Sequence, residues 1–394
     1  MILTNKQEKG LKICVARFKD KKPYTCIAGY AGTGKSTLVK FIIAALNLDP
    51  EEDVAYVAFT GKAAKVLAQK GCPNATTAHK LLYYSKELPN GTYIHKPKTS
   101  FEKQFKLIVI DEISMLPRDM WNLLLTHHIP IICCGDPEQL PPIDPDKDNH
   151  VLDKPHVFLD EIMRQAAESE IIRLSMHIRE GNELSTFDCL KNQVQIINNN
   201  ELITGMYNWA DQIICGTNKK RNEINTIVRS LREFDQTPQI NDKIISLSNH
   251  WDFCSSTGLP ITNGSIGYLN HFWLDTIYLP KYIYEKPLEI MRADIIMEDG
   301  EKYKEVPIDY QYLFTGKELL TSKAKYLLRR NRRCIDPPFD FTYGYAITCW
   351  KAQGSEWDKI LIFEESFPFD RETHKKFLYT AVTRASEKIV VVKK

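Results

Sequence analysis

The apolar residues of this chain follow two patterns. Short continuous apolar runs, which are typical of strands buried in a parallel sheet, occur at residues 24–28, 107–110, 129–134, 212–215, 359–363 and 389–392. Directly after the first run, the apolar residues recur at helical spacing between Lys35 and Leu46. The patterns predict buried strands in both halves of the chain and an amphipathic helix that follows the first strand.

Two stretches interrupt this alternation. Residues 83–105 contain Leu-Pro-Asn-Gly-Thr-Tyr-Ile at positions 88–94, and Asn-Gly between β-forming residues predicts a hairpin. Residues 238–337 are rich in Tyr, Ile and turn residues, and they end with six Lys and Arg residues between positions 323 and 333. Such a basic run is usually a solvated face, but beside a nucleic-acid channel it would follow the phosphates.

The composition limits the class of protein. A chain of 394 residues with 43% hydrophobic and 26% charged residues indicates a soluble globular protein of two or three domains. The net charge of +2 neither requires nor excludes nucleic acid. Ten cysteines without C-x-x-C or zinc spacing indicate reduced thiols and a cytoplasmic location. The absence of a signal peptide and of a membrane-length apolar stretch predicts no membrane association.

Residues 29–37 match G-x-x-x-x-G-K-[ST], the pattern of a phosphate-binding loop. The glycines allow successive backbone N–H groups to face the phosphates, and the loop leads into a helix N-terminus, which favours anions. A glycine-rich turn that matches by chance is improbable between a strand and a helix. We therefore predict a nucleoside triphosphate bound by Gly29, Gly32, Thr33, Gly34, Lys35, Ser36 and Thr37.

Acidic and amide residues follow the next two strands. Asp111 and Glu112 directly follow the strand at 107–110, and Gln139 follows the strand at 129–134. All three are therefore predicted at the ligand-binding edge of one sheet. Asp111 and the Ser36 hydroxyl are predicted to hold Mg²⁺, and Glu112 is predicted to polarise the attacking water. Gln139 is positioned to contact the γ-phosphate.

The ordered motifs resemble a known family. Gly-x-Ala-Gly-Thr-Gly-Lys-Ser, Asp-Glu-Ile-Ser and Gly-Asp-x-x-Gln-Leu-Pro-Pro resemble motifs I, II and III of superfamily 1 helicases, and residues 345–356 and 378–385 resemble motifs V and VI. The match is similar to the RecD-like branch, superfamily 1B, and in length to the Dda-type DNA helicases of phages. The resemblance implies two RecA-like α/β domains that hold ATP between them.

Further ATP-site residues carry over by resemblance. Gln7 matches the glutamine that reads adenine, and Gln353 and Gly354 lie in motif V. Arg164 matches motif IV and Arg384 is the motif VI arginine. An arginine fork can hold several phosphate oxygens while charge redistributes, although a surface ion pair is the alternative role for each arginine.

The resemblance also implies contacts with the nucleic acid, which we expect from Thr60, Lys62, Thr77, His79, Thr348 and Trp350. Thr60 could equally be only a helix N-cap. Trp350 stands where the branch usually has histidine, so it either packs or stacks on a base or sugar. In the family the insertion at 83–105 carries a pin that splits the duplex, and Tyr93 and Phe101 are both candidates for its wedge; a hairpin that only closes a loop is the alternative.

By resemblance, domain 1A spans residues 1–82 and 106–150, and pin domain 1B spans 83–105. Domain 2A spans 151–237 and 338–394, and an SH3-like β-barrel, domain 2B, spans 238–337. The resemblance implies an ATP-dependent DNA helicase of replication, recombination or repair that moves 5′→3′ on single-stranded DNA and unwinds forked duplexes. It also implies a monomer, single-strand-binding or replication proteins as partners, and, for a phage protein, the host cytoplasm.

Several alternatives remain at this point. A translocase that displaces proteins without unwinding would share every motif, and an RNA-acting relative would differ little, because backbone contacts to single strands discriminate weakly. A nucleotide-gated binding protein is disfavoured by Glu112, Gln139 and Arg384. A kinase-like P-loop enzyme would leave motifs V and VI without a purpose.

Overall fold

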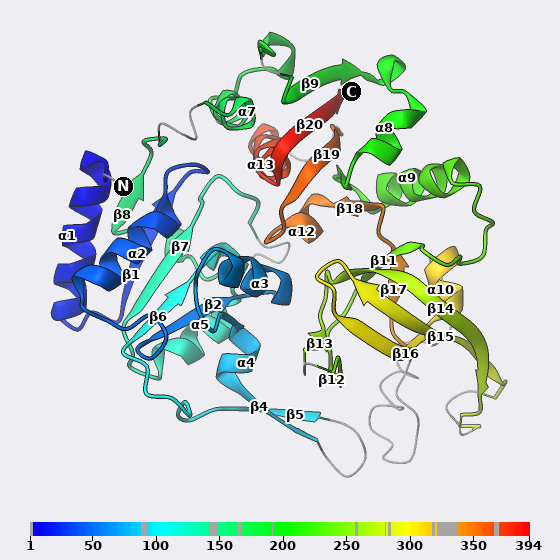
Figure 1. Ribbon diagram of the computed structural model, residues 1–394, viewed down its shortest axis with the longest axis horizontal. Helices are drawn as coiled ribbons and strands as arrows, with labels where there is room; N and C mark the ends of the chain where they lie inside the picture. Colours follow the sequence, from blue (N-terminus) through cyan, green and yellow to red (C-terminus); the bar gives the residue numbers. More distant parts are fainter. Residues whose placement is uncertain are drawn as a thin grey trace. The chain divides into compact units, whose positions relative to one another are not determined.

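The structure is a computed structural model. It describes residues 3–87, 93–141, 148–163, 168–190, 192–256, 259–279, 281–282, 285–316, 320, 338–365 and 370–394. The chain divides into two compact units (Figure 1). Unit 1 contains Met1–Tyr83, Pro97–Thr217 and Thr348–Lys394, and unit 2 contains Tyr84–Lys96 and Asn218–Ile347.

Unit 1 begins with a six-stranded sheet in the order β3-β2-β6-β7-β1-β8, in which all neighbouring strands run parallel. Its strands are β1 (Tyr24–Gly29), β2 (Val54–Ala58), β3 (Thr76–Thr77), β6 (Leu107–Ile110), β7 (Ile131–Gly135) and β8 (Val157–Leu159). The four central strands are buried along nearly their whole length, as expected for a parallel sheet covered on both faces.

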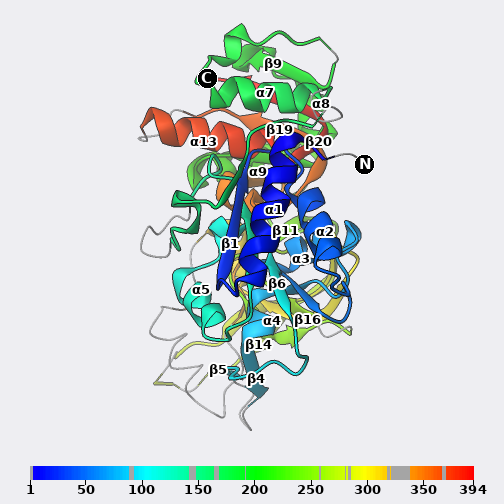
Figure 2. The ribbon, with the colours of Figure 1, turned by 90° about the vertical axis from the view of Figure 1, so that its left-hand side faces the viewer.

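Helices cover both faces of this sheet and form one apolar core on each side. Helices α1 (Asn5–Lys19), α2 (Lys35–Ala45) and α3 (Gly61–Gln69) contribute to one core, and α4 (Ala78–Leu82) and α5 (Arg118–Leu125) to the other. Helix α1 packs against β1 and lies next to it in Figure 2. Short 3₁₀ turns lie at Ile113–Met115 and Val151–Asp153.

A second, five-stranded sheet has the order β18-β10-β19-β20-β9. The β10–β19, β19–β20 and β20–β9 pairs are parallel. Its strands are β9 (Val194–Asn198), β10 (Gln212–Cys215), β18 (Ala346–Thr348), β19 (Trp357–Phe363) and β20 (Ala385–Lys393). The accompanying helices are α7 (Glu170–Arg179), α8 (Thr204–Trp209), α12 (Cys349–Ala352) and α13 (Arg371–Val382), with 3₁₀ turns at Leu184–Thr186 and Asn199–Glu201. Helix α7 packs against α13 (Figures 1 and 2).

Unit 2 contains an antiparallel sheet in the order β16-β15-β14-β11-β17, a small β12-β13 pair, and most of the β4-β5 pair. Its strands are β4 (Tyr83–Glu87), β5 (Tyr93–Pro97), β11 (Lys243–Ser246), β12 (His250–Cys254), β13 (Pro260–Ile261), β14 (Ile266–Ile277), β15 (Leu288–Met297), β16 (Lys302–Ile308) and β17 (Phe341–Tyr343). Its described residues form helices α9 (Asn218–Leu231) and α10 (Tyr310–Thr315).

A buried ion pair anchors α9 within unit 2. The Arg229 guanidinium donates to both carboxylate oxygens of Asp242, at 3.0 and 3.1 Å, and the two side chains are 8% and 0% exposed. The Tyr345 hydroxyl and the Gln239 backbone N–H also donate to this carboxylate. A buried carboxylate therefore has a partner for each of its oxygens, as burial of a charge requires.

The predicted strands are confirmed closely. The apolar runs at 107–110 and 212–215 coincide with β6 and β10, and the other four runs differ from β1, β7, β19 and β20 by one to four residues at an end. The predicted hairpin is present as the β4-β5 pair, while its Asn-Gly turn and the basic run at 323–333 lie outside the described residues. Among the described residues, no helix has both the length and the apolar character that crossing a bilayer requires.

Candidate active site

The phosphate-binding loop joins β1 to α2, as predicted. Gly29 ends the strand and Lys35 begins the helix. Gly32 and Gly34 have φ angles of +76° and +75°, which side chains other than glycine adopt at a cost. A Cβ at Gly34 would also lie 2.5 Å from the Gln7 amide nitrogen. The loop therefore needs glycine for its conformation and for its packing.

The Lys35 ammonium lies over this loop. Its Nζ donates to the Gly29 and Tyr30 carbonyl oxygens, at 2.7 and 3.0 Å. Ser36 and Thr37 follow in the first turn of α2, where backbone N–H groups are unpaired within the helix. The loop thus combines a cation with a helix N-terminus, an arrangement suited to phosphate.

The two predicted carboxylates follow β6. The Asp111 side chain accepts a hydrogen bond from the Glu112 backbone N–H at 3.0 Å. Burial raises the pKa of Asp111, the nearby Glu112 charge raises it further, and Lys35 opposes the rise. Two crowded carboxylates of this kind fit a divalent cation, whose charge would offset their repulsion and desolvation. Asp111 with Ser36 therefore suits Mg²⁺.

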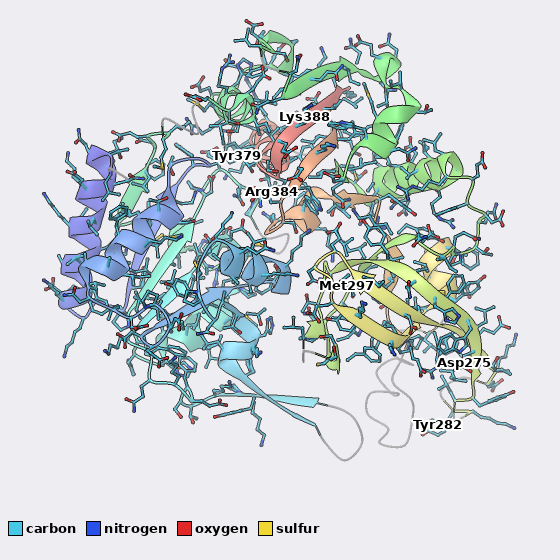
Figure 3. All side chains as sticks on the ribbon, viewed as in Figure 1. Asp275, Tyr282, Met297, Tyr379, Arg384 and Lys388 are labelled. Carbon is cyan, nitrogen blue, oxygen red and sulfur yellow. The ribbon has the colours of Figure 1, made fainter. Side chains whose placement is uncertain are left out.

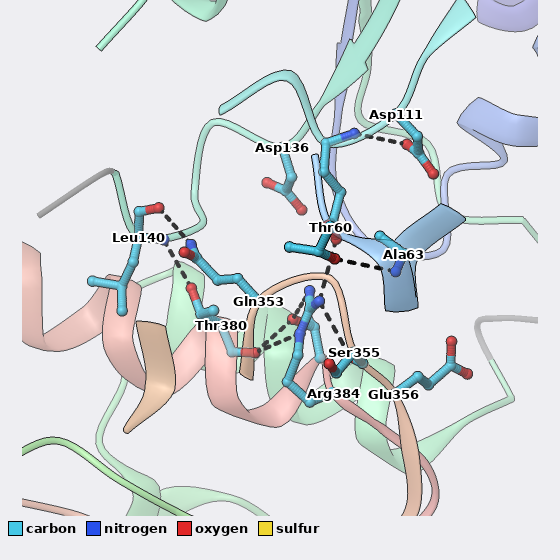
Figure 4. Close-up of polar contacts among 12 residues, drawn as sticks. Thr60, Ala63, Asp111, Asp136, Leu140, Gln353, Ser355, Glu356, Thr380 and Arg384 are labelled. Atoms are coloured by element: carbon cyan, nitrogen blue, oxygen red, sulfur yellow. Dashed lines mark hydrogen bonds and ion pairs between the residues drawn. The ribbon is translucent and has the colours of Figure 1, made fainter. Parts of the chain in front are cut away.

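Arg384 brings a guanidinium from the second sheet to Glu112, where its Nη1 lies 3.2 Å from Oε1 (Figure 4). The Arg384 side chain is 7% exposed, and its Nε also donates to the Thr380 carbonyl oxygen. Gly354, at φ +74°, packs against the other Glu112 oxygen, which a Cβ would approach to 3.2 Å. The predicted base and the predicted arginine therefore occupy one site.

The loop after β7 is held by residues of α12, its C-cap and α13, the helices that accompany the second sheet (Figure 4). The Leu140 N–H donates to the Thr380 hydroxyl at 2.8 Å, and the Gln353 amide donates to the Leu140 carbonyl oxygen at 2.7 Å. The Trp350 indole N–H donates to the Pro141 carbonyl oxygen at 3.2 Å. Gln139 is half-buried within this segment. The segment that carries Gln139 is therefore fixed from both sheets of unit 1.

Three contacts at this site were not predicted from the sequence. The Tyr379 hydroxyl accepts from the Ala31 N–H at 2.9 Å and donates to Asp136 at 2.6 Å. The Lys62 ammonium lies 4.0 Å from the centre of the Trp357 ring, within cation–π range. Tyr379 lies five residues before Arg384 in the motif VI match, but the match does not indicate which loops its hydroxyl contacts.

Gln7 has structural partners. Its side-chain oxygen accepts from the Thr4 N–H and its backbone N–H donates to the Thr4 hydroxyl, which forms a capping box at the start of α1. Its amide nitrogen donates to the Thr33 carbonyl oxygen at 3.0 Å. The side chain is 1% exposed, so Gln7 links α1 to the phosphate-binding loop.

Several expected nucleic-acid residues have local roles. Thr60 and Thr77 accept backbone hydrogen bonds as the N-caps of α3 and α4, which does not conflict with a phosphate contact at the same helix ends. The His79 ring lies between Phe59 and Tyr83, with ring centroids 5.8 and 6.1 Å away.

The remaining candidates are distributed as follows. Thr348 is the N-cap residue of α12 and Tyr93 begins β5, but the Tyr93 side chain is not described. Phe101 lies beyond the hairpin, and its ring stacks on His127 at 4.1 Å between centroids. Of the two wedge candidates, Tyr93 is thus the one on the hairpin. Arg164 lies outside the described residues.

Comparisons with known proteins agree with this arrangement. A model of the AAA domain matches residues 5–201, half of the chain, and a model of the UvrD-like helicase C-terminal domain matches residues 343–392. The chain is 23% identical to the ATP-dependent DNA helicase dda of Enterobacteria phage T4, and the match covers 97% of both chains. It is 26% identical to the ATP-dependent RecD2 DNA helicase of Deinococcus radiodurans, over 92% of this chain but 46% of that relative.

The fold also matches a solved structure. The Bacteroides Pif1 helicase, in a crystal structure with ADP-AlF3 and ssDNA, has a TM-score of 0.52 and 18% sequence identity, and the match covers 99% of this chain and 92% of that one. This likeness identifies the two parallel sheets of unit 1 as RecA-like. The chain therefore belongs to the AAA-domain family and is a superfamily 1B helicase related to the Dda and RecD-type helicases.

Proposed function

We propose that this helicase hydrolyses ATP between its two RecA-like sheets, uses the cycle to move 5′→3′ along single-stranded DNA, and separates forked duplexes. The observation that carries the proposal is the 3.2 Å ion pair between Arg384 and Glu112. It joins the candidate base after one sheet to the candidate finger of the other, at the edge where Lys35 and Asp111 also lie.

Each residue of this site has a defined task in phosphoryl transfer. Lys35 and the loop N–H groups hold the phosphates, and Ser36 and Asp111 hold Mg²⁺, which neutralises charge on the phosphate oxygens when bound. Glu112 accepts a proton from the attacking water, and Arg384 stabilises the charge that spreads over the transferred group. Glu112 lies at the edge of the first sheet and Arg384 lies beside the second. Hydrolysis therefore requires the two sheets to be held close together.

The same geometry couples hydrolysis to movement. Gln139 contacts the γ-phosphate from a segment that both sheets hold, so loss of the phosphate alters an interaction that favours the closed arrangement. If each RecA-like domain binds the strand with a different affinity in the two states, the cycle produces directed steps. Arg164, by resemblance, supplies a second guanidinium to the phosphate.

The proposed domains extend this mechanism to strand separation. Residues 1–82 with 106–150 form domain 1A, and residues 151–237 with 338–394 form domain 2A. The β4-β5 hairpin is the pin of domain 1B, with Tyr93 as its wedge, and strands β11 to β16 of unit 2 belong to an SH3-like domain 2B. We further propose a monomer that acts in the cytoplasm, on single-stranded and forked DNA, together with single-strand-binding or replication proteins.

Two substitutions test the site. Lys35→Ala and Glu112→Gln should each abolish the ATP hydrolysis that single-stranded DNA stimulates, measured as phosphate release. Lys40→Ala provides a control, because Lys40 lies on the same helix and is exposed. Near-normal turnover in either site variant would refute the assignment.

A translocase that moves without unwinding is the second candidate, and the hairpin argues for unwinding instead. Separation of a forked duplex, compared with displacement of streptavidin from a biotinylated single strand, distinguishes the two activities. The same substrates made of RNA distinguish a DNA helicase from an RNA-acting relative.

A further inference from the structure

The Tyr379 hydroxyl connects two loops of the active site that are remote from each other in sequence. Tyr379 lies on α13 and is 1% exposed, and Figure 3 labels it together with Arg384. Its hydroxyl accepts from the Ala31 N–H of the phosphate-binding loop at 2.9 Å. It donates to the Asp136 carboxylate at 2.6 Å. One buried oxygen thus contacts both loops.

The contact with Asp136 is a hydrogen bond to a buried carboxylate, so the Tyr379 hydroxyl contributes more than packing. Its side chain is 4% exposed, and burial is the largest cause of its raised pKa. The carboxylate also accepts from the Glu138 backbone N–H at 3.0 Å, which shapes the turn before Gln139. A phenylalanine could fill the volume of the tyrosine ring, but it would leave a buried carboxylate and a loop N–H with one partner fewer.

The neighbouring residue of α13 holds the far end of the same segment. Thr380 is 0% exposed, and its hydroxyl accepts from the Leu140 N–H at 2.8 Å. Consecutive residues of one helix therefore fix Asp136 and Leu140, and Gln139 lies between them. The same helix leads directly to Arg384. Docking of α13 would set the positions of the phosphate-binding loop, the Gln139 segment and the arginine together.

We propose that Tyr379 is a positioning residue for ATP hydrolysis: its hydroxyl holds the Ala31 turn and the Asp136–Leu140 segment in the relative position that the chemical step needs. This inference rests on the proposed function. On this proposal, Tyr379 is unnecessary for nucleotide binding, because Lys35 and the glycine-rich loop bind the nucleotide from the first sheet alone. Its hydroxyl is necessary for hydrolysis, in which Gln139 acts together with Glu112 and Arg384.

The test is the steady-state kinetics of Tyr379→Phe with saturating single-stranded DNA. A hydrogen bond to a charged group is worth about 10- to 100-fold in an equilibrium or a rate, so we expect kcat to fall by about that factor. The KM for ATP should change by less than about threefold, because capture is intact. Tyr303→Phe is the matched control, since Tyr303 is also buried and its hydroxyl donates to the Leu259 carbonyl oxygen at 2.9 Å in unit 2. That control should lose thermal stability and keep its kcat.

The double variant Tyr379→Phe with Asp136→Asn separates positioning from simple satisfaction of a buried charge. An asparagine removes the buried charge that has lost the Tyr379 hydroxyl, so thermal stability should recover while kcat stays low. Recovery of both quantities, or a Tyr379→Phe kcat within threefold of wild type, would overturn the proposal. Glu112→Gln in the same assay keeps this result separate from the ATPase assignment. That assignment fails if wild type shows no turnover or if Glu112→Gln turns over normally, whatever the Tyr379→Phe result.

Discussion

Replacement of Arg384 tests the link between the two sheets most sharply. We expect Arg384→Ala to lower the DNA-stimulated kcat by about 10³–10⁵, the range for arginine fingers of GTPases. At 1.36 kcal/mol for each tenfold change, this loss equals about 4–7 kcal/mol of transition-state stabilisation. Arg384→Lys keeps the charge but not the planar fork, so we expect a fall of about 100-fold or more.

The structure predicts a smaller effect on stability. Arg384 and Glu112 are 7% and 24% exposed, so water still reaches the carboxylate, and the loss of its partner should cost less than the roughly 3–5 kcal/mol of a fully buried pair. The other contacts are hydrogen bonds from the guanidinium to uncharged oxygens of Thr380, Thr383 and Ser355, at 3.2, 3.3 and 3.5 Å, which are long and therefore weak for N–H···O bonds. Arg384→Lys keeps a cation near Glu112, so it should lose only part of these hydrogen bonds and still fold.

Phosphate release with single-stranded DNA measures kcat, and thermal unfolding checks that each variant is folded. Binding of a fluorescent ATP analogue should stay within about threefold of wild type, because Lys35 is intact. Arg371→Ala is the control: Arg371 is an exposed arginine at the start of the same helix. DNA-stimulated turnover of both Arg384 variants within threefold of wild type would refute the role of this guanidinium.

Three further predictions concern stability and strand separation. Asp242→Ala leaves the buried Arg229 guanidinium without its carboxylate and should lower the free energy of unfolding by about 3–5 kcal/mol. Asp275→Ala breaks a half-exposed ion pair and should lower it by about 1 kcal/mol or less. Urea titrations in which the two losses are equal would contradict this. Tyr93→Ala should retain DNA-stimulated ATP hydrolysis and lose fork unwinding in a gel-based strand-separation assay, and unwinding at the wild-type rate would exclude Tyr93 as the wedge. The pKa of His156 is lowered chiefly by burial and also by Arg17, so the unfolded state binds more protons and stability is lost as pH falls below about 6.5. His156→Asn should therefore show a smaller fall in unfolding temperature between about pH 7.5 and 5, and an unchanged fall would refute this origin.

The features that the sequence predicts well are local. Residues 107–110 are apolar at every position and are followed directly by two acidic residues. Both the strand and the carboxylates after it can therefore be predicted from the sequence. The phosphate-binding loop can be predicted for the same reason, because its glycines and Lys35 lie within seven residues. Such segments carry their structural information in contiguous positions.

The contacts that join remote segments were not predictable in this way. Tyr379 and Ala31 are 348 residues apart, and no local pattern indicates that a helical tyrosine will reach a loop N–H. Phe101 illustrates the same limit, because sequence spacing placed it in the insertion, but its ring stacks on His127 and packs against the apolar core that α4 and α5 share. Trp350 likewise has a backbone partner, Pro141, that its own motif does not reveal.

The measurement that tests the central claim most directly is ATP-dependent strand separation of matched DNA forks that carry either a 5′ or a 3′ single-stranded tail. The account predicts that the purified protein separates the 5′-tailed substrate alone, and that Glu112→Gln abolishes this activity while the protein remains folded. Separation of the 3′-tailed substrate alone, or separation that persists in Glu112→Gln, would contradict it.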